Sequence, residues 1–280
     1  MAKKDCPYCE GTGWRPVESR TGGSVRRVAP CNCQDAEHAD HLLDLARIPP
    51  RYEHCAFENF NIRRDVESGV ANPSLIRAKL AAEGFVKEYP VDFGLLFVGP
   101  TGAGKTHLAV AVLRELIIRK GVQCLFYDFR DLLKEIQDSY NPVSQSSEFQ
   151  VLAPVIDAEV LLLDEMASAN PSDWVKETLG HIINSRYNKK KVTLITTTLP
   201  FGEAPRQSPE PSGKGRRAGS SEREEIRMPS GESVPDTERT LNQFGVTLRS
   251  RLYEMCRLVE IHSGDFRKDI KQAGYRVHGQ

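Results

Sequence analysis

The chain has 280 residues, and its 38 Lys and Arg residues balance its 38 Asp and Glu residues, so its formal net charge is zero. This length suits one large domain or two unequal ones. The charge balance excludes an arm-like basic protein, so any nucleic-acid contact must come from a local patch. No apolar run approaches the ~20 residues that cross a bilayer, and the first residues lack the apolar region of a secretory signal. We therefore expect a cytoplasmic protein without a membrane partner.

The first part of the chain is polar and contains four of its seven cysteines, namely Cys6, Cys9, Cys31 and Cys33. A reducing compartment argues against a disulfide framework. Two pairs of closely spaced thiolates on tight turns can instead form a tetrahedral site that suits Zn²⁺. A segment of ~40 residues rarely folds on its own apolar core, so the metal would supply its folding energy. We expect residues 1–41 to form a zinc ribbon with a structural metal, and we keep a redox pair or free thiols as alternatives.

Residues 42–74 read as a connector, which begins with a short helix ended by Pro49 and Pro50. The chain then alternates helical and strand patterns. Apolar strands are expected at 95–98, 124–127, 160–163, 192–196 and 257–261, and helices at 74–87, 107–119 and 132–137 and after Ser172. Strands that are apolar throughout and separated by helices imply a parallel sheet with helices on both faces. The expected fold class is therefore α/β, with a small zinc ribbon at the N-terminus.

Residues 202–239 interrupt this pattern, because they are rich in Gly, Pro and Ser and contain few apolar side chains. Such a segment cannot bury enough apolar surface to offset its ordering entropy. We expect a disordered insertion within a single domain that spans residues 75–280.

A phosphate-binding loop follows the first expected strand of this domain and precedes a helix. The motif G-x-x-x-x-G-K-[ST] is matched by Gly99, Pro100, Thr101, Gly102, Ala103, Gly104, Lys105 and Thr106. Its glycines allow backbone N–H groups to point at phosphate oxygens, assisted by the positive end of the helix. Lys105 would reach the β- and γ-phosphates, and Thr106 would bind Mg²⁺. His107 is expected near the nucleotide.

An acidic pair, Asp164 and Glu165, ends the expected strand at 160–163. Together with the phosphate loop it indicates hydrolysis of a nucleoside triphosphate, with Asp164 on Mg²⁺ and Glu165 orienting the attacking water. The strand at 192–196 runs into Thr198, which is our candidate for contact with that water or the γ-phosphate. The alternative is that these threonines only favour a strand end.

Several runs together resemble the DnaC/DnaI-type AAA+ helicase loaders and the related IstB-type transposition helpers. The runs are Ile48–Tyr52, Phe57–Phe60, Gly99–Thr106, Leu161–Glu165, Ser172–Val175, Ile183–Tyr187 and Ser250–Cys256. The resemblance covers roughly residues 42–200 and 240–270 and implies a P-loop AAA+ (ASCE) sheet. The cysteine-rich segment resembles the helicase-contacting module of the DnaI-type branch.

The resemblance also implies roles for single residues. Arg251 matches an arginine that reaches across a subunit interface to the neighbouring ATP site, although Arg249 is an extra arginine that could take this role. The family usually has Asn where Thr198 stands, which indicates weaker sensing of water or γ-phosphate. Arg267 resembles a family arginine whose role we leave open. Lys105, Thr106, Asp164 and Glu165 keep the roles given above.

The leading functional hypothesis is a loader that places the replicative helicase on single-stranded DNA. Its cofactors would be ATP, Mg²⁺ and Zn²⁺, it would self-associate on ATP, and its ATPase would be slow until stimulated by oligomerisation, DNA or helicase. The run Lys189–Lys191 beside Tyr187 could contact DNA phosphates, or it could be a solvated helix end. The alternatives are a transposition helper that acts on duplex DNA with a transposase, and an adaptor that binds ATP as a switch without hydrolysis.

Overall fold

The computed structural model describes residues 6–10, 12–17, 27–62, 71–141, 147–166, 171–198 and 244–268. Its centre is a five-stranded sheet in the order β4-β5-β6-β3-β7. The strands are β3 (Gly94–Val98), β4 (Cys124–Asp128), β5 (Val160–Asp164), β6 (Val192–Thr197) and β7 (Cys256–Glu260). All four neighbouring pairs are parallel. The expected parallel sheet is confirmed, and β6 lies between the strands that carry the phosphate loop and the acidic pair.

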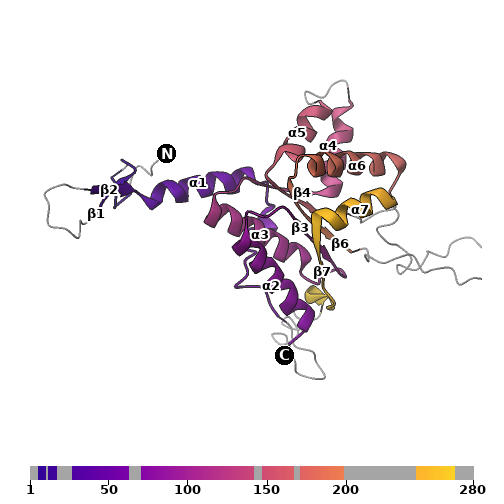
Figure 1. Ribbon diagram of the computed structural model, residues 1–280, viewed down its shortest axis with the longest axis horizontal. Helices are drawn as coiled ribbons and strands as arrows, with labels where there is room; N and C mark the ends of the chain where they lie inside the picture. Colours follow the sequence, from indigo (N-terminus) through magenta and orange to yellow (C-terminus); the bar gives the residue numbers. More distant parts are fainter. Residues whose placement is uncertain are drawn as a thin grey trace, which may run out of the picture.

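Helices cover both faces of this sheet (Figure 1). One face packs against α2 (Pro73–Glu88) and α3 (Lys105–Lys120), and the other against α4 (Phe129–Ser139), α5 (Glu148–Asp157), α6 (Asp173–Asn188) and α7 (Val246–Met255). Successive residues of β5 alternate between these two cores, since Leu162 packs with α3 and Leu163 with α6. Both side-chain directions are buried, which explains why the strand is apolar throughout.

Local interactions set the helix ends. Ser172 accepts a hydrogen bond from the N–H of Val175 and caps α6 as expected. At α2 the cap is Asn72, whose side chain accepts from the N–H of Ser74, so the helix expected at 74–87 begins one residue earlier, at Pro73. Helix α5 has no counterpart among the expected elements. It begins with a capping box between Ser147 and Gln150, a signal that the sequence did contain.

The N-terminal module is a two-stranded antiparallel sheet, β1 (Trp14–Val17) and β2 (Arg27–Pro30), joined to the body by α1 (Asn32–Leu45). Figure 1 shows α1 extending away from the body toward these two strands. The helix expected after residue 42 therefore begins ten residues earlier, and the expected boundary between residues 41 and 42 lies inside it. The end of α1 meets the sheet at β4, where the N–H of Phe126 donates to the carbonyl of Ala46 over 2.8 Å.

Two further expectations concern the chain as a whole. The insertion expected at residues 202–239 lies outside the described residues. Among the residues that are described, the helices are too short or too polar to cross a membrane.

Candidate functional site

The phosphate loop connects the end of β3 to the first turn of α3. Gly102 and Gly104 have φ angles of 75° and 100°, which L side chains rarely adopt. A Cβ at Gly104 would also lie 2.7 Å from the ring of Phe60, and one at Gly102 would overlap the carboxylate of Asp265. Both glycines are therefore required by the backbone conformation and by close neighbours, and the loop is enclosed by segments from both ends of the chain.

Lys105 lies at the start of α3 and is only 3% exposed. Its ammonium group donates hydrogen bonds of 2.9 Å to the carbonyls of Gly99 and Pro100, on its own loop. Burial lowers the pKa of Lys105, and the nearby carboxylates of Glu165 and Asp164 act against this shift. The lysine is thus held under the loop, where phosphate oxygens would offer it stronger partners than neutral carbonyls.

Asp164, the last residue of β5, lies next to the loop. The hydroxyl of Thr106 donates to its Oδ1 over 2.8 Å, so the sheet brings together two residues that are 58 positions apart. Burial raises the pKa of Asp164 to about 6, and hydrogen bonds from the hydroxyls of Thr196 and Thr106 counteract this rise. A carboxylate and a hydroxyl in contact are oxygen ligands of the kind that Mg²⁺ prefers, so this pair fits the expected metal.

Glu165 follows with a left-handed backbone, at a φ of 53°. Its N–H donates to the hydroxyl of Thr196 over 2.9 Å, and its side chain lines the cavity above the loop. The structure therefore brings Thr196, which sequence reasoning did not single out, into contact with the acidic pair. Thr198 is half-buried and is not among the residues that line the cavity, so its contact with water or γ-phosphate stays a prediction.

The cavity above the loop has a volume of about 530 Å³. It lies between the loop, the connector that precedes α2, and the segment that follows β7. Its lining residues are Arg51, Tyr52, His54, Cys55, Asn59, Phe60, Asn61, Thr101–His107, Glu165, Phe266 and Arg267. The volume and the mixture of aromatic, cationic and loop groups suit a nucleotide-sized ligand. From the sequence, the connector carried an expected short helix and part of the family resemblance, and Arg267 had no assigned role. In the structure, residues of the connector and Arg267 line the cavity.

His107 links the loop to the connector. Its Nε2 lies 2.9 Å from the carbonyl of Ala56, and its ring centroid is 5.4 Å from that of Phe60. Burial lowers the pKa of His107, which favours the neutral ring. The residue lines the cavity and is hydrogen-bonded to the connector, and its expected place near a nucleotide stays a prediction.

The two candidate arginines lie on α7, which packs against α6. The guanidinium of Arg251 lies 5.8 Å from the ring centroid of Tyr187, and that of Arg249 lies 5.4 Å from the ring centroid of Tyr253. Neither is among the residues that line the cavity of its own chain. The expected role of Arg251 or Arg249 at a neighbouring subunit's ATP site stays a prediction.

The sulfur atoms of the four N-terminal cysteines all lie within 4.8 Å of one another. Cys6 and Cys31 are separated by 3.7 Å and Cys9 and Cys33 by 3.4 Å. Sulfurs around a tetrahedral zinc ion are about 3.8 Å apart, given a Zn–S bond of about 2.3 Å, so the four residues fit Zn²⁺. The N–H groups of Tyr8 and Cys9 lower the pKa of Cys6 to about 7, which favours the thiolate form that binds metal.

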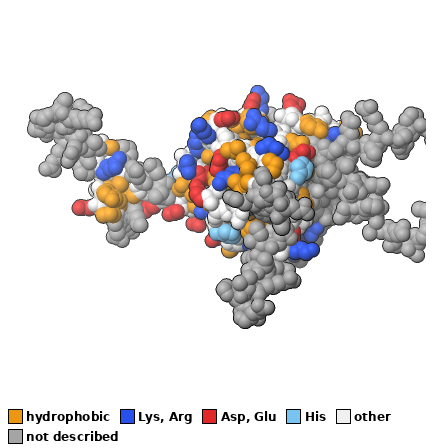
Figure 2. Space-filling view, turned by 90° about the horizontal axis from the view of Figure 1, so that it is seen from below, with side chains coloured by type: hydrophobic (Ala, Val, Ile, Leu, Met, Phe, Trp, Pro, Cys, Tyr) orange, Lys and Arg blue, Asp and Glu red, His pale blue; other side chains and the backbone are white. Residues whose placement is uncertain are grey.

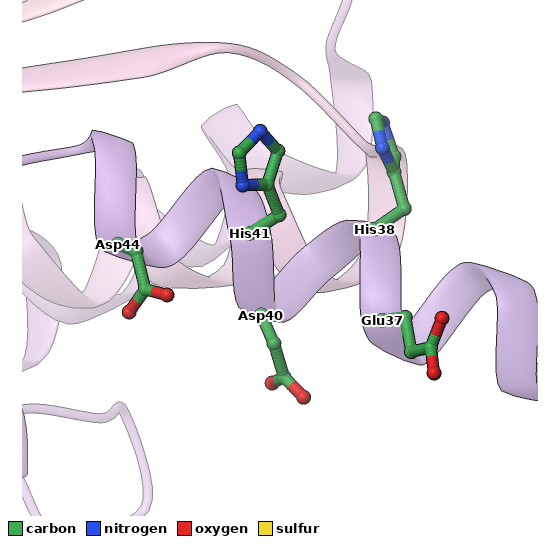
Figure 3. A pocket seen from close by; sticks show the side chains of 5 residues that line it. All are labelled: Glu37, His38, Asp40, His41 and Asp44. Atoms are coloured by element: carbon green, nitrogen blue, oxygen red, sulfur yellow. The ribbon is translucent and has the colours of Figure 1, made fainter. Parts of the chain in front are cut away.

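A second group of polar side chains lies along α1 (Figure 3). A shallow hollow there is lined by Glu37, His38, Asp40, His41 and Asp44. His38 and His41 extend to one side of the helix and Asp40 and Asp44 to the other. They do not converge as ligands, and within the described part of the chain only the four cysteines form a candidate metal group.

The basic run after α6 is partly neutralised. Lys189 forms an ion pair of 2.6 Å with Asp157, and the hydroxyl of Tyr187 donates to the carboxylate of Glu254 over 2.9 Å. Figure 2 shows acidic and basic side chains interspersed over the face of the body seen from below. A DNA contact at Lys189–Lys191 stays a prediction.

Comparisons with known proteins agree with this geometry. A family model described as IstB-like ATP binding protein matches residues 32–207, more than half of the chain. The replicative helicase loader DnaC of Escherichia coli strain K12 is 26% identical over 176 residues, which are 62% of this chain and 68% of DnaC.

Two solved structures extend the comparison to three dimensions. A crystal structure of the DnaC helicase loader has a TM-score of 0.54 and 30% sequence identity, and the match covers 76% of this chain and 99% of that chain. A crystal structure of DnaI has a TM-score of 0.52 at 18% identity, covering 78% and 94%, and shows the fold alone. The fold is thus the P-loop AAA+ fold that the resemblance implied, and the chain belongs to the family of IstB-like ATP binding proteins, with DnaC-type helicase loaders among its relatives.

Proposed function

We propose that this chain is an ATP-dependent loader of the replicative DNA helicase onto single-stranded DNA. The observation that carries the proposal is the match to the DnaC helicase loader, which spans nearly all of that chain. The range matched by the family model, residues 32–207, includes the loop and the acidic pair. The match to E. coli DnaC covers about two thirds of that protein's length, so the activity is proposed for the shared ATPase domain together with the cysteine module.

ATP would bind in the cavity above the loop, with its phosphates against the N–H groups of residues 101–106. Thr106 and Asp164 would hold Mg²⁺, which neutralises charge on the β- and γ-phosphates when it is bound. Lys105 would exchange its two loop carbonyls for phosphate oxygens. Glu165, which lines the cavity beside the loop, would orient the attacking water and accept its proton.

The arginines on α7 support a requirement for self-association. Neither lines its own chain's cavity, whose lining arginines are Arg51 and Arg267. We propose that an arginine of α7 stabilises transition-state charge in a neighbouring subunit's site. We assign this role to Arg251 and expect slow turnover by the isolated chain. DNA or helicase that promotes association would accelerate it.

The cysteine module would hold Zn²⁺ and contact the helicase. Its hydrophobic side chains include Tyr8, Trp14 and Val28, which are 74%, 53% and 61% exposed, and Figure 2 shows hydrophobic side chains gathered on this lobe, away from the body. Exposed apolar side chains of this size are typical of a contact surface for another protein. The surface is carried on α1, so a partner could bind it without covering the ATP cavity.

The test is a loading assay on circular single-stranded DNA coated with single-strand binding protein, with the host's replicative helicase. Unwinding of an annealed oligonucleotide should require this chain and ATP. The proposal fails if the helicase unwinds equally well without the chain, or if the chain has no effect at any ratio to helicase.

A transposition helper is the second candidate, favoured by the IstB-like description of the matching family model. It predicts ATP-dependent assembly on duplex DNA and stimulation of a transposase, with no effect on helicase loading. To separate the two candidates, ATP-dependent assembly of the chain is compared on the protein-coated single-stranded circles without helicase and on duplex circles.

A further inference from the structure

The acidic pair is attached to the neighbouring strand β6 through one buried residue. Thr196 is fully buried near the end of β6, which lies between β5 and β3 in the sheet. Its side chain points at the residues that follow β5, and its backbone carbonyl accepts a hydrogen bond of 2.9 Å from the N–H of Met166. Residues 164–166 are thus held by a single position on the next strand.

The hydroxyl of Thr196 makes two hydrogen bonds of opposite sense. It donates to Oδ1 of Asp164 over 2.6 Å and accepts from the N–H of Glu165 over 2.9 Å. A hydroxyl has one proton to donate, so the bond to Asp164 uses its full donor capacity. The two members of the acidic pair therefore share one oxygen atom.

Each bond fixes a different part of the site. Oδ1 of Asp164 accepts from Thr196 and from Thr106, which aims the carboxylate at the start of α3. The bond to the N–H of Glu165 holds a non-glycine residue with a left-handed φ of 53°, a conformation that needs such support. That backbone turn directs Glu165 into the cavity, while Asp164 stays 2% exposed below it.

We infer that Thr196 is a positioning residue for hydrolysis, whose hydroxyl sets Asp164 for Mg²⁺ and Glu165 for the attacking water. The inference rests on the proposed ATPase function and deepens it. Nucleotide binding itself depends on the loop and the cavity walls, and Thr196 does not line that cavity. Thr196 should therefore govern turnover and the Mg²⁺ requirement more than nucleotide affinity.

Two substitutions separate positioning from packing. Thr196→Val keeps the volume and the branched shape and removes the hydroxyl, whereas Thr196→Ser keeps the hydroxyl and removes a methyl group. Thr178→Val is the matched control, because Thr178 is a buried threonine on α6 outside the cavity lining. If Thr196 had a purely structural role, the serine and valine variants should have similar ATP turnover. If it positions the acidic pair, only the valine variant should lose turnover.

The experiment measures three quantities on the full zinc-loaded chain: ATP turnover at saturating ATP, the Mg²⁺ concentration for half-maximal turnover, and affinity for a fluorescent ADP in excess EDTA. For Thr196→Val we expect turnover to fall about 10- to 100-fold, since a buried hydrogen bond to a charged group is lost. The half-maximal Mg²⁺ concentration should rise, ADP affinity without Mg²⁺ should stay within about twofold, and Thr196→Ser and Thr178→Val should stay near wild type.

The inference is overturned if Thr196→Val matches wild type in turnover and Mg²⁺ requirement, or if it loses metal-free ADP affinity as strongly as turnover. Failure of the proposed function has a different signature, since the wild-type chain would then show no turnover. In that case the Mg²⁺-dependent gain in ATP affinity replaces turnover as the readout. An equal gain in wild type and Thr196→Val would overturn the inference.

Discussion

The ATP site and the cysteine module are both built from residues distant in the sequence, but different forces bring those residues together. At the ATP site, Asp164 and Thr196 lie at or near the ends of buried strands, and Thr106 lies in the first turn of α3, which packs on the same sheet. In the module, Cys6, Cys9, Cys31 and Cys33 form a small cluster of their own, beside two short strands and the start of α1. The first site is therefore held by packing and should survive loss of its ligand, whereas the second should depend on the Zn²⁺ that we propose it holds.

Removal of the proposed zinc should produce the largest difference between the two regions. Chelation, or the double change Cys6→Ser and Cys9→Ser, should remove about 10 kcal/mol or more of metal-linked folding free energy from the module. The AAA+ body should keep its melting temperature and its nucleotide affinity, because its two cores do not include these cysteines. Metal content by mass spectrometry and thermal unfolding followed with bound ADP check this. A body that unfolds together with the module would show that the two regions are not independent.

The arginines on α7 test whether the ATP site is complete within one chain. Arg251→Ala should lower turnover about 10³-fold, as loss of an arginine in trans does in related phosphoryl-transfer systems. Mixing Arg251→Ala chains with Lys105→Ala chains should restore part of the turnover, because each supplies what the other lacks.

Arg249→Ala is the matched variant for this experiment, since Arg249 lies on the same helix and also contacts an aromatic ring. It should keep near wild-type turnover. If Arg249→Ala is defective and Arg251→Ala is not, the role belongs to Arg249. If neither variant loses turnover, the requirement for a neighbouring subunit is wrong.

Glu165→Gln separates ATP binding from ATP hydrolysis at the ATP site. The amide cannot accept a proton from water, so turnover should fall about 100-fold or more while Mg²⁺ and ATP still bind. Glu177→Gln, an exposed position on α6, is the control. Unchanged turnover in Glu165→Gln would favour the adaptor that uses ATP only as a switch.

The raised pKa of Asp164 predicts a modest pH effect confined to the ATP site. Because burial raises this pKa to about 6, the carboxyl is increasingly protonated below pH 6 and loses its affinity for Mg²⁺. Turnover at limiting Mg²⁺ should therefore increase as the pH is raised, with a midpoint near pH 6. Saturating Mg²⁺ should move this midpoint to a lower pH, because the metal competes with the proton for Asp164. A midpoint that is the same at both Mg²⁺ concentrations would contradict this account.

The sequence predicted the parts of this molecule that follow from local patterns. The five strands were expected within one residue at each end, because four of them are buried on nearly every side-chain position. The edge strand β7 is the exception, since Arg257 and Glu260 are exposed on it. The loop Gly99–Thr106, the acidic pair and the four cysteines were recognised from spacing alone, and the structure brings each group together.

The rest depended on tertiary neighbours that no local pattern shows. Thr196, Thr197 and Thr198 form a run at a strand end, and only the register of β6 beside β5 selects Thr196 as the partner of the acidic pair. The walls of the cavity come from the connector and from Phe266 and Arg267, which lie far from the loop in sequence. The start of helix α1 was expected too late in the sequence, because the cysteine-rich segment was assigned to a separate module up to residue 41. In the structure Cys33 lies in the first turn of this helix.

The most direct measurement of the central claim is the mass of complexes formed by the zinc-loaded chain and its host's replicative helicase, by native mass spectrometry with ATP and without. The account predicts a defined complex that is lost when Cys6 and Cys9 become Ser, while that variant still binds ATP. Absence of any complex with the wild-type chain, under every nucleotide condition, would contradict the helicase-loader function.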